Sequence, residues 1–332
     1  MRIWYIYSIN SSKITGRYGI KTMIKILLFY KYIDITYPVQ IKKWQERLCK
    51  QLNLKGRVII AHEGINGTLG GSFDNLERYK NEVNQHPLFG NIDFKGSDGA
   101  TDDFPRLRIV VRNEITYLGI DPTIITAKNG GIHLAPQQAH ELMKKAPEDL
   151  IIFDARNTYE SRIGTFNNAI KAEITNFRDL PNYIDNNTDL FKDKEVLMFC
   201  TGGIRCERAS AYLKSKNITK KVYQIEGGIH RYAEQFPDGL FRGKNYVFDG
   251  RIAVSVTQDV LGTCDICSTS CDEYTNCLNA ECNKQFIACP NCIQKLGNTC
   301  SELCLELVQN NKVVIRKIHK KVILTKTLSS NP

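Results

Sequence analysis

The feature that most constrains the fold is an apolar run at residues 195–199 that stops abruptly at Cys200 and leads through two glycines into a helical pattern over 205–216. A strand that turns directly into a helix is typical of a parallel sheet with helices on both faces, because parallel strands need crossover connections. The same alternation continues on either side, with strands predicted at 150–155 and 221–225 and a helix after Pro136. We therefore predict an α/β domain over 130–245. Cys200 is expected at the carboxyl edge of its sheet, where such folds hold their sites.

The loop after this strand reads Cys200-Thr201-Gly202-Gly203-Ile204-Arg205. Backbone N–H groups and the positive end of a helix dipole converge on its first residue, and Arg205 adds a fixed cation. These groups stabilise a thiolate, so the pKa of Cys200 is expected to be lowered. The competing interpretation is a buried core thiol. Cys206 is a possible resolving thiol or a packed side chain, and it is expected to face another direction.

The N-terminal part predicts a different architecture. Strands are expected at 25–32, 57–61, around Thr68 and Leu69, and at 92–95, with helices starting at Pro38 and spanning 73–88. This β-α-β-β-α-β order is typical of a ferredoxin-like sandwich, in which two helices cover one face of an antiparallel sheet.

A further extended segment at 106–115 carries Arg106, Arg108 and Arg112 at even spacing, and hence on one face of a strand. Such a face can grip phosphates, and the formal net charge of +10 favours polyanions at long range. The alternative is an ordinary solvated strand face. A basic tail at 311–332 holds further candidates for RNA contact, Lys317, Lys320 and Lys321, and a basic tail can equally be solvated.

Nine of the 12 cysteines crowd between Cys264 and Cys304. Two pairs, Cys264-x-x-Cys267 and Cys289-x-x-Cys292, have the spacing of a four-thiolate zinc module. The others are Cys271, Cys277, Cys282, Cys300 and Cys304, enough in total for two four-cysteine sites with one thiol left over. Disulfides are the competing interpretation. An iron–sulfur cluster is a weaker one, because no compact cluster-type run is present.

The sequence features that target a protein to a membrane or to secretion are not seen here, and this bears on its cellular compartment. No stretch approaches the roughly 20 apolar residues of a membrane helix. The first 22 residues lack the long apolar region of a secretory signal, and clustered thiols suit a reducing cytosol, so we expect a cytoplasmic protein. Residues 1–22 are expected to be an extension, with Met23 as a possible working start.

Several strings resemble those of the rhodanese-like tRNA uridine hydroxylases. They are Asp154-Ala155-Arg156-Asn157-Thr158-Tyr159-Glu160, Gly164-Thr165-Phe166, the loop from Cys200 to Glu207, and Glu226-Gly227-Gly228-Ile229. Outside this part the resemblance includes Glu63-Gly64-Ile65-Asn66-Gly67-Thr68, Tyr246-Val247-Phe248-Asp249 and the cysteine-rich end. It covers about residues 23–304.

The resemblance implies an acylphosphatase-like α+β domain at 23–120, a central rhodanese domain at 130–245 and a cysteine-rich module at 246–310. It implies conversion of uridine 34 in tRNA to 5-hydroxyuridine with molecular oxygen, the anticodon arm as partner, and a required loop cysteine. It also implies that Asp154, Arg156 and Glu160 support the loop, against the alternative of a surface ion pair.

Two other classes of function stay open. A general sulfurtransferase would carry a persulfide on Cys200, and a non-catalytic thiol-binding or scaffold protein would carry out neither reaction. No protein partner can be predicted from the sequence.

Overall fold

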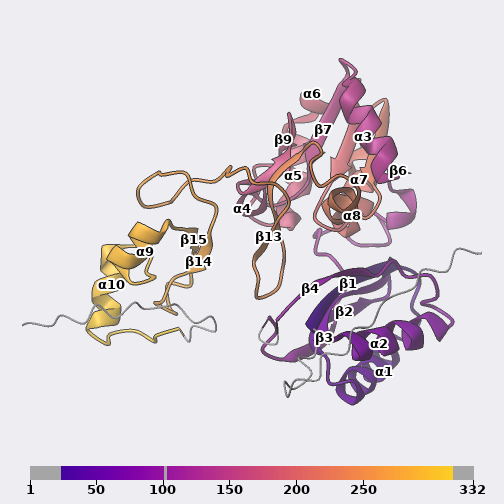
Figure 1. Ribbon diagram of the computed structural model, residues 1–332. Coiled ribbons are helices and arrows are strands. Elements are labelled where there is room, and N and C mark those ends of the chain that lie inside the picture. Colours follow the sequence, from indigo (N-terminus) through magenta and orange to yellow (C-terminus); the bar gives the residue numbers. More distant parts are fainter. Residues whose placement is uncertain (1–23, 101–102, 317–332) are drawn as a thin grey trace, which may run out of the picture.

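The computed structural model describes residues 24–100 and 103–316. Figure 1 shows three parts: an N-terminal unit, a central unit above its sheet, and a C-terminal module to one side. Among the helices of the described residues, none is both long and apolar enough to cross a membrane. The expected extension at 1–22, most of the basic tail, and Lys317, Lys320 and Lys321 lie outside the described residues.

The N-terminal unit has the expected ferredoxin-like order. Its elements are β1 (Ile24–Tyr32), α1 (Pro38–Gln51), β2 (Lys55–Ala61), β3 (Gly64–Ser72), α2 (Phe73–Gln85) and β4 (Lys95–Asp98), followed by β5 (Leu107–Val111). The sheet order is β4-β1-β3-β2-β5, antiparallel except that β5 runs parallel to β2. Pro38 starts α1, and the Ser72 side chain caps α2 by accepting from the backbone N–H of Asn75.

Both helices lie against one face of this sheet and bury apolar residues there, including Ile41, Leu48 and Leu76. The opposite face carries no helix and is turned toward the central unit (Figure 1). This uncovered face forms one wall of the candidate site.

Two strand predictions in this unit were wrong in their bounds. The strand expected at 92–95 is β4 at Lys95–Asp98, because Ile92 and Phe94 pack into the core while the less apolar segment after them pairs with β1. The strand expected at 106–115 ends as β5 at Val111. Arg112 makes one more backbone bond to Ile60, and the Glu63 carboxylate then captures the N–H of Ile115.

The central unit is built on a parallel sheet, as predicted, and its five strands have the order β6-β11-β10-β7-β9. Its strands are β6 (Ile132–Leu134), β7 (Leu150–Asp154), β9 (Ile170–Lys171), β10 (Glu195–Phe199) and β11 (Lys221–Ile225). Apolar clusters lie on both faces of the sheet, one with α5 (Leu180–Asn186) and α7 (Ile204–Ser215), the other with α3 (Pro136–Lys145) and α8 (Gly228–Gln235). The remaining helical segments are η1 (Ala127–Asn129), α4 (Thr158–Ser161), η2 (Phe177–Asp179) and α6 (Thr188–Phe191).

A second, antiparallel sheet, not predicted from the sequence, leads from the central unit into the C-terminal module. It pairs β8 (Gly164–Phe166) with β12 (Phe241–Tyr246) and β12 with β13 (Ala253–Ser255). The C-terminal module then contains β14 (Tyr274–Asn276), β15 (Gln285–Ile287), α9 (Pro290–Leu296) and α10 (Glu302–Gln309).

Buried polar contacts tie the N-terminal and central units together. Arg208 of α7 is fully buried and forms ion pairs with Glu114 and, at 3.7 Å, with Glu63. On the other side of the interface, the Tyr30 hydroxyl donates to Glu207 at 3.1 Å. The two units therefore meet at the helix that follows the reactive loop.

Candidate active site

Cys200 follows the last residue of β10, the central strand of the parallel sheet, and its side chain is fully buried. The backbone N–H of Gly203 donates to its sulfur at 3.2 Å. Two more N–H groups, from Ile229 and His230 at the start of α8, donate to the carbonyls of Cys200 and Thr201 at 3.0 Å. The loop is thus held between the first turns of two helices.

The pKa of the Cys200 thiol is lowered to about 5. Burial alone would raise this pKa, but it is outweighed by a hydrogen bond from the Cys206 thiol, the charge of Arg205 and the backbone N–H groups of both residues. These surroundings favour the thiolate form of Cys200, the form that the sequence analysis expects.

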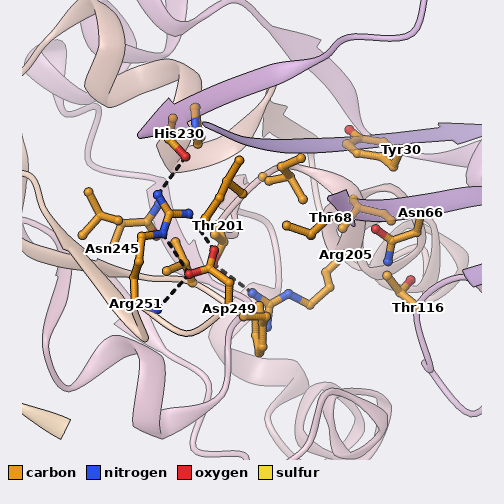
Figure 2. A pocket seen from close by; sticks show the side chains of 18 of the residues that line it. Tyr30, Asn66, Thr68, Thr116, Thr201, Arg205, His230, Asn245, Asp249 and Arg251 are labelled. Atoms are coloured by element: carbon orange, nitrogen blue, oxygen red, sulfur yellow. Dashed lines mark hydrogen bonds and ion pairs between the residues drawn. The ribbon is translucent and has the colours of Figure 1, made fainter. Parts of the chain in front are cut away.

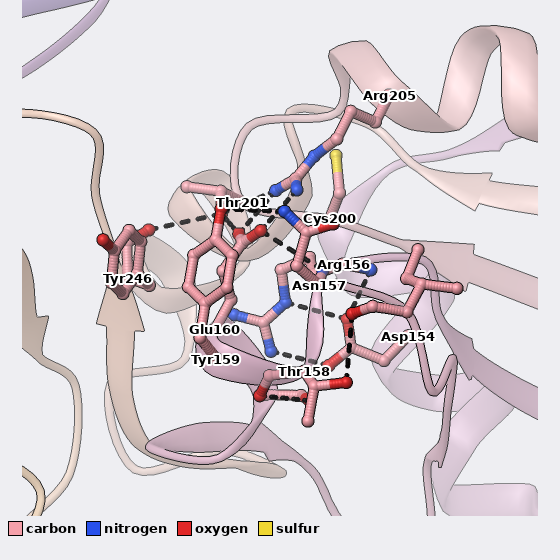
Figure 3. A network of polar contacts seen from close by, with 12 residues as sticks. Asp154, Arg156, Asn157, Thr158, Tyr159, Glu160, Cys200, Thr201, Arg205 and Tyr246 are labelled. Carbon is pink, nitrogen blue, oxygen red and sulfur yellow. Dashed lines mark hydrogen bonds and ion pairs between the residues drawn. The ribbon is translucent and has the colours of Figure 1, made fainter. Parts of the chain in front are cut away.

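Arg205 reaches the thiolate while pairing with a buried carboxylate. Its two terminal nitrogens donate to Glu160 at 2.5 and 2.7 Å, and one also lies 3.2 Å from the Thr201 hydroxyl, which itself donates to Glu160 (Figure 3). Glu160 is completely buried. The two bonds to Glu160 therefore fix the Arg205 guanidinium at the loop. This geometry is consistent with the expectation that Glu160 supports the loop.

Asp154 and Arg156 contact the end of strand β10, just before the loop. Their side chains form a bidentate pair at 2.8 and 2.6 Å, and both are fully buried, so the alternative of a surface ion pair is wrong (Figure 3). Arg156 also donates to the carbonyl of Gly164 and lies over the ring of Phe199, the residue before the reactive cysteine. The pair contacts the end of β10 rather than the side chains of the loop.

The expectation that Cys206 faces another direction was wrong. It is fully buried in the same apolar cluster as Cys200 and donates a hydrogen bond to its sulfur. Burial, followed by this interaction with Cys200, raises the pKa of Cys206 well above its ordinary value. Cys206 is therefore the protonated member of the pair.

The glycines of the loop permit a close approach by the N-terminal sheet. Gly203 has a positive φ of 97°, and a methyl group on it would lie 2.8 Å from the Tyr30 hydroxyl. A methyl group on Gly202 would lie 3.0 Å from Leu28. Gly203 therefore favours glycine through its backbone conformation, and at Gly202 a larger residue would force the Leu28 side chain of β1 to move.

A cavity of about 810 Å³ opens between the uncovered face of the N-terminal sheet and the reactive loop. Figure 2 shows residues of both units in its walls, with Tyr30, Asn66 and Thr68 on the sheet side and Thr201 and Arg205 from the loop. β12 and the segment after it supply a further wall, with Asn245 from the strand and Phe248 and Arg251 from the segment. Cys200 does not line the cavity, and its sulfur lies beneath the loop surface.

Phe248 stands out among the lining residues because 58% of it is exposed. The Arg205 guanidinium lies 5.5 Å from its ring centre, and the Tyr246 ring packs against it in a T-shaped arrangement. An exposed aromatic ring that lines a cavity is suited to stacking with a planar ligand.

Several lining residues had no role predicted from the sequence, above all Arg57, Asn66, His230 and Phe248. They come from strands, a helix and a loop far apart in the chain, and only tertiary packing brings them to one cavity. One local signal was available: Asn66 and Thr68 are alternating polar residues in β3 and therefore share a face.

Of the three arginines predicted on one strand face, only Arg108 lies within β5, with Arg106 before the strand and Arg112 after it. Arg108 is paired in register with Arg57 of β2, which lines the cavity. Burial, followed by the nearby charges of Arg108 and Arg112, lowers the pKa of Arg57. Within residues 24–100 and 103–316, none of Arg57, Arg106, Arg108 and Arg112 forms an ion pair. This cluster of positive charges favours the binding of an anion.

The cysteine-rich module gathers its thiols into two groups of four. Cys264, Cys267, Cys289 and Cys292 form one and Cys277, Cys282, Cys300 and Cys304 the other, with all sulfurs of a group within 4.8 Å. Cys271 is the thiol left over. One pair of sulfurs in each group, Cys267 with Cys289 and Cys282 with Cys300, is 3.6 Å apart, which fits tetrahedral zinc at Zn–S distances of about 2.3 Å and is too long for an S–S bond of about 2.05 Å.

A parallel sheet whose central strand ends in a six-residue cysteine loop, beside an acylphosphatase-like sheet, defines a rhodanese-domain protein with two accessory units. Comparison with known families agrees. Residues 24–115 match the UPF0176 acylphosphatase like domain, 135–235 the Rhodanese-like domain and 242–305 the Rhodanase C-terminal.

Similar proteins extend over most of the chain. A tRNA uridine(34) hydroxylase of Corynebacterium jeikeium is 38% identical over 86% of this chain and 96% of its own length. Proteins of the same name from Corynebacterium aurimucosum and Onion yellows phytoplasma are 40% and 39% identical over 82% and 86% of this chain, and over 93% of their own lengths. The chain belongs to the tRNA uridine(34) hydroxylase family.

Proposed function

We propose that this protein hydroxylates uridine 34 of tRNA to 5-hydroxyuridine with molecular oxygen as co-substrate, and that the sulfur of Cys200 is its reactive group. The observation that carries the proposal is a cysteine whose pKa is lowered to about 5 in a loop that lines a cavity shared with a second unit. Relatives that match this chain over most of their own length carry the corresponding name.

The site residues take distinct roles in this proposal. Cys200 reacts as a thiolate or as a persulfide, and Thr201, Gly202, Gly203, Ile204 and Arg205 form its cradle. Glu160 fixes Arg205, while Asp154 and Arg156 support the end of β10. Because the sulfur lies beneath the loop surface, we expect the loop to shift, or a second sulfur to extend Cys200, when a base is bound. The role of Cys206 as a resolving thiol stays a prediction.

The anticodon arm is the proposed partner. A base in an anticodon loop is single-stranded, so it can enter a pocket at low cost. Arg106, Arg108 and Arg112, together with Arg57, are proposed to bind the phosphates beside it, and the lack of ion pairs on this face among the described residues supports the proposal. Lys317, Lys320 and Lys321 remain candidates, and the cytoplasm is the expected place of action.

Zinc is the proposed metal of the cysteine-rich module, with one ion in each group of four thiols. The sulfur spacing supports it, and zinc would supply structural stability rather than chemistry at Cys200. The first group adjoins the central unit, where Tyr246 donates to Gln285 at 2.9 Å and Tyr274 donates to the carbonyl of Tyr159 at 2.8 Å. The division into units 23–120, 130–245 and 246–310 belongs to the same proposal.

A deletion strain tests the proposal. Mass spectrometry of its tRNA nucleosides should show loss of 5-hydroxyuridine and of anything derived from it. A plasmid with the intact gene should restore the nucleoside, and one encoding Cys200→Ser should not. Unchanged 5-hydroxyuridine in the deletion strain, with no second gene of this family present, would contradict the proposal.

The competing sulfurtransferase and scaffold functions make different predictions. A sulfurtransferase would convert thiosulfate and cyanide to thiocyanate and leave the mass of tRNA nucleosides unchanged. A thiol-binding scaffold would do neither. Assays of both reactions on one preparation therefore separate the three functions.

A further inference from the structure

We propose that Asn66 is a specificity-determining residue that recognises the N3–H group of the target uracil. The inference rests on the proposed function, and it adds a base-reading contact from the N-terminal unit, on the opposite wall of the cavity from the reactive loop. The amide orientation of this asparagine is fixed by the backbone.

The side-chain nitrogen of Asn66 donates to the carbonyl of Ile115 at 3.0 Å. A carbonyl oxygen can only accept, so the NH₂ group must point at Ile115 and the amide cannot rotate by half a turn without losing this bond. The Oδ1 oxygen receives no hydrogen bond from any side chain or backbone group in the described segments. Asn66 thus offers an acceptor of fixed identity while it lines the cavity.

The position of Asn66 relative to the reactive loop follows from the strand register. Asn66 is the cross-strand partner of Tyr30, on the same face of the sheet. The Tyr30 hydroxyl approaches Gly203 so closely that a methyl group there would lie 2.8 Å away. Adjacent strands are about 4.8 Å apart, so Asn66 lies one strand away from the residue that contacts the loop, and its shorter side chain leaves room in front of it. Figure 2 shows it on the sheet side of the cavity beside Thr68 and Thr116.

The chemistry of this oxygen separates uracil from cytosine. The N3 atom of uracil carries a hydrogen, whereas the same atom of cytosine has a lone pair and would face Oδ1 acceptor to acceptor. N3 also lies across the ring from C5 and C6, so a base held at N3 by Asn66 turns its reactive edge away from the sheet and toward the loop. A buried acceptor left unpaired costs affinity, so the contact should contribute about tenfold or more to discrimination.

Ile115, which orients the Asn66 amide, has a second side-chain partner that supplies a control. The backbone N–H of Ile115 donates to Glu63 at 2.7 Å, so Glu63 and Asn66 hold the same residue from its two sides. Glu63→Gln weakens the support of Ile115 and leaves the Asn66 oxygen in place. Asn66→Ser removes that oxygen, while its hydroxyl can still donate toward Ile115.

The test uses tRNA carrying either uridine or N3-methyluridine at position 34, which differ only where Asn66 is proposed to bind. kcat/KM for 5-hydroxylation is measured for both substrates with the wild type, Asn66→Ser, Asn66→Ala and Glu63→Gln, with thermal midpoints to establish that each variant is folded. We expect the wild type to favour uridine by about tenfold or more. The Asn66 variants should lose most of this preference, because they lose the acceptor and make room for the methyl group. Glu63→Gln should slow both substrates by a similar factor and keep their ratio.

An unchanged ratio in both Asn66 variants, or an equal loss of preference in Glu63→Gln, would overturn the assignment while leaving hydroxylation itself intact. If the wild type forms no 5-hydroxyuridine from the unmodified tRNA, the proposed function fails and this inference fails with it. The ratio of the two kcat/KM values therefore tests the role of Asn66, whereas product formation from unmodified tRNA tests the proposed function.

Discussion

At the scale of single residues, the state of Cys200 depends on a balance between burial and nearby donors. Burial opposes ionisation, while the thiol of Cys206, the charge of Arg205 and backbone N–H groups favour it strongly enough to lower the pKa to about 5. The sequence predicted Arg205 and the backbone contribution because both lie within the loop. It did not predict the hydrogen bond from Cys206, since the direction of a side chain in the first turn of a helix depends on how that helix packs.

The charge of Arg205 and its pairing with Glu160 can be separated by two matched variants. Thiolate is the reacting form, so alkylation of Cys200 should be half-maximal near pH 5, lose rate as the pH falls below that value and level off above it. Arg205→Gln removes a cation that favours the thiolate, so the half-maximal pH should rise by about one unit or more. Glu160→Gln keeps the cation and removes a competing anion, so the half-maximal pH should not rise.

Mass spectrometry of the peptide containing Cys200, after alkylation at a series of pH values, measures this midpoint independently of how slowly a buried thiol reacts. Coincident midpoints for the wild type and Arg205→Gln would remove Arg205 from the activation of the thiol.

At the scale of helices and strands, α7 carries both the site and the junction between two units. Its first turn follows the reactive loop, and Arg208 one turn later pairs with Glu114 and Glu63. The sequence predicted this helix, the three strands at the middle of the parallel sheet and the ferredoxin-like order well, because each depends on local apolar periodicity. It misplaced β4 and the end of β5, since pairing with β1 and capture of Ile115 by Glu63 override local propensity.

Two ion pairs join residues far apart in the sequence, one buried and one exposed, and we expect very different losses of stability when they are broken. Arg208→Met should destabilise the protein by about 3–5 kcal/mol, because it leaves the buried Glu114 carboxylate without its partner. Lys128→Gln breaks an exposed pair with Asp34 and should cost less than about 1 kcal/mol. Thermal or denaturant unfolding of both variants measures the contrast. Equal, small effects would show that Arg208 does not hold the interface.

At the scale of the whole molecule, the cavity exists only because three separate parts of the chain meet. The sequence, through its resemblance to a family, predicted the three parts and the loop. It could not predict which residues of the N-terminal sheet face the loop, because Arg57, Asn66 and Tyr30 are ordinary strand residues until the units are packed together. The clustering of thiols in the cysteine-rich module was easier to predict, because Cys-x-x-Cys spacing is a local feature of the sequence.

The two groups of four thiols predict two equivalents of zinc in protein purified under reducing conditions. Cys267→Ser and Cys282→Ser should each lower the metal content by one equivalent, because each removes one ligand of a different group. Cys271→Ser is the matched control and should retain both. Elemental analysis of the four proteins tests this. Metal-free wild type with bridged cysteines in non-reducing mass spectra would favour disulfides instead.

If the arginines of the uncovered sheet face bind phosphates, the affinity for tRNA should depend on salt concentration. The double variant Arg57→Gln with Arg108→Gln should weaken binding of all tRNAs to a similar degree, and the slope of log affinity against log salt should fall by about one to two. Lys42→Gln, which removes a charge from helix α1 on the other side of the sheet, should leave the slope nearly unchanged. Equal slopes for the double variant and the wild type would mean that this face is merely solvated.

The most direct test of the central claim is transfer of oxygen from isotopically labelled O₂ to uridine 34 by purified protein with a chemical reductant present. The proposal predicts that the wild type and Cys49→Ala, which changes a buried thiol in the N-terminal core, place labelled oxygen in 5-hydroxyuridine. Cys200→Ser should remain folded and place none, because a serine hydroxyl stays protonated in the same loop. Labelled 5-hydroxyuridine formed by Cys200→Ser at the wild-type rate would contradict the role of this sulfur, and product carrying only unlabelled oxygen would contradict the reaction.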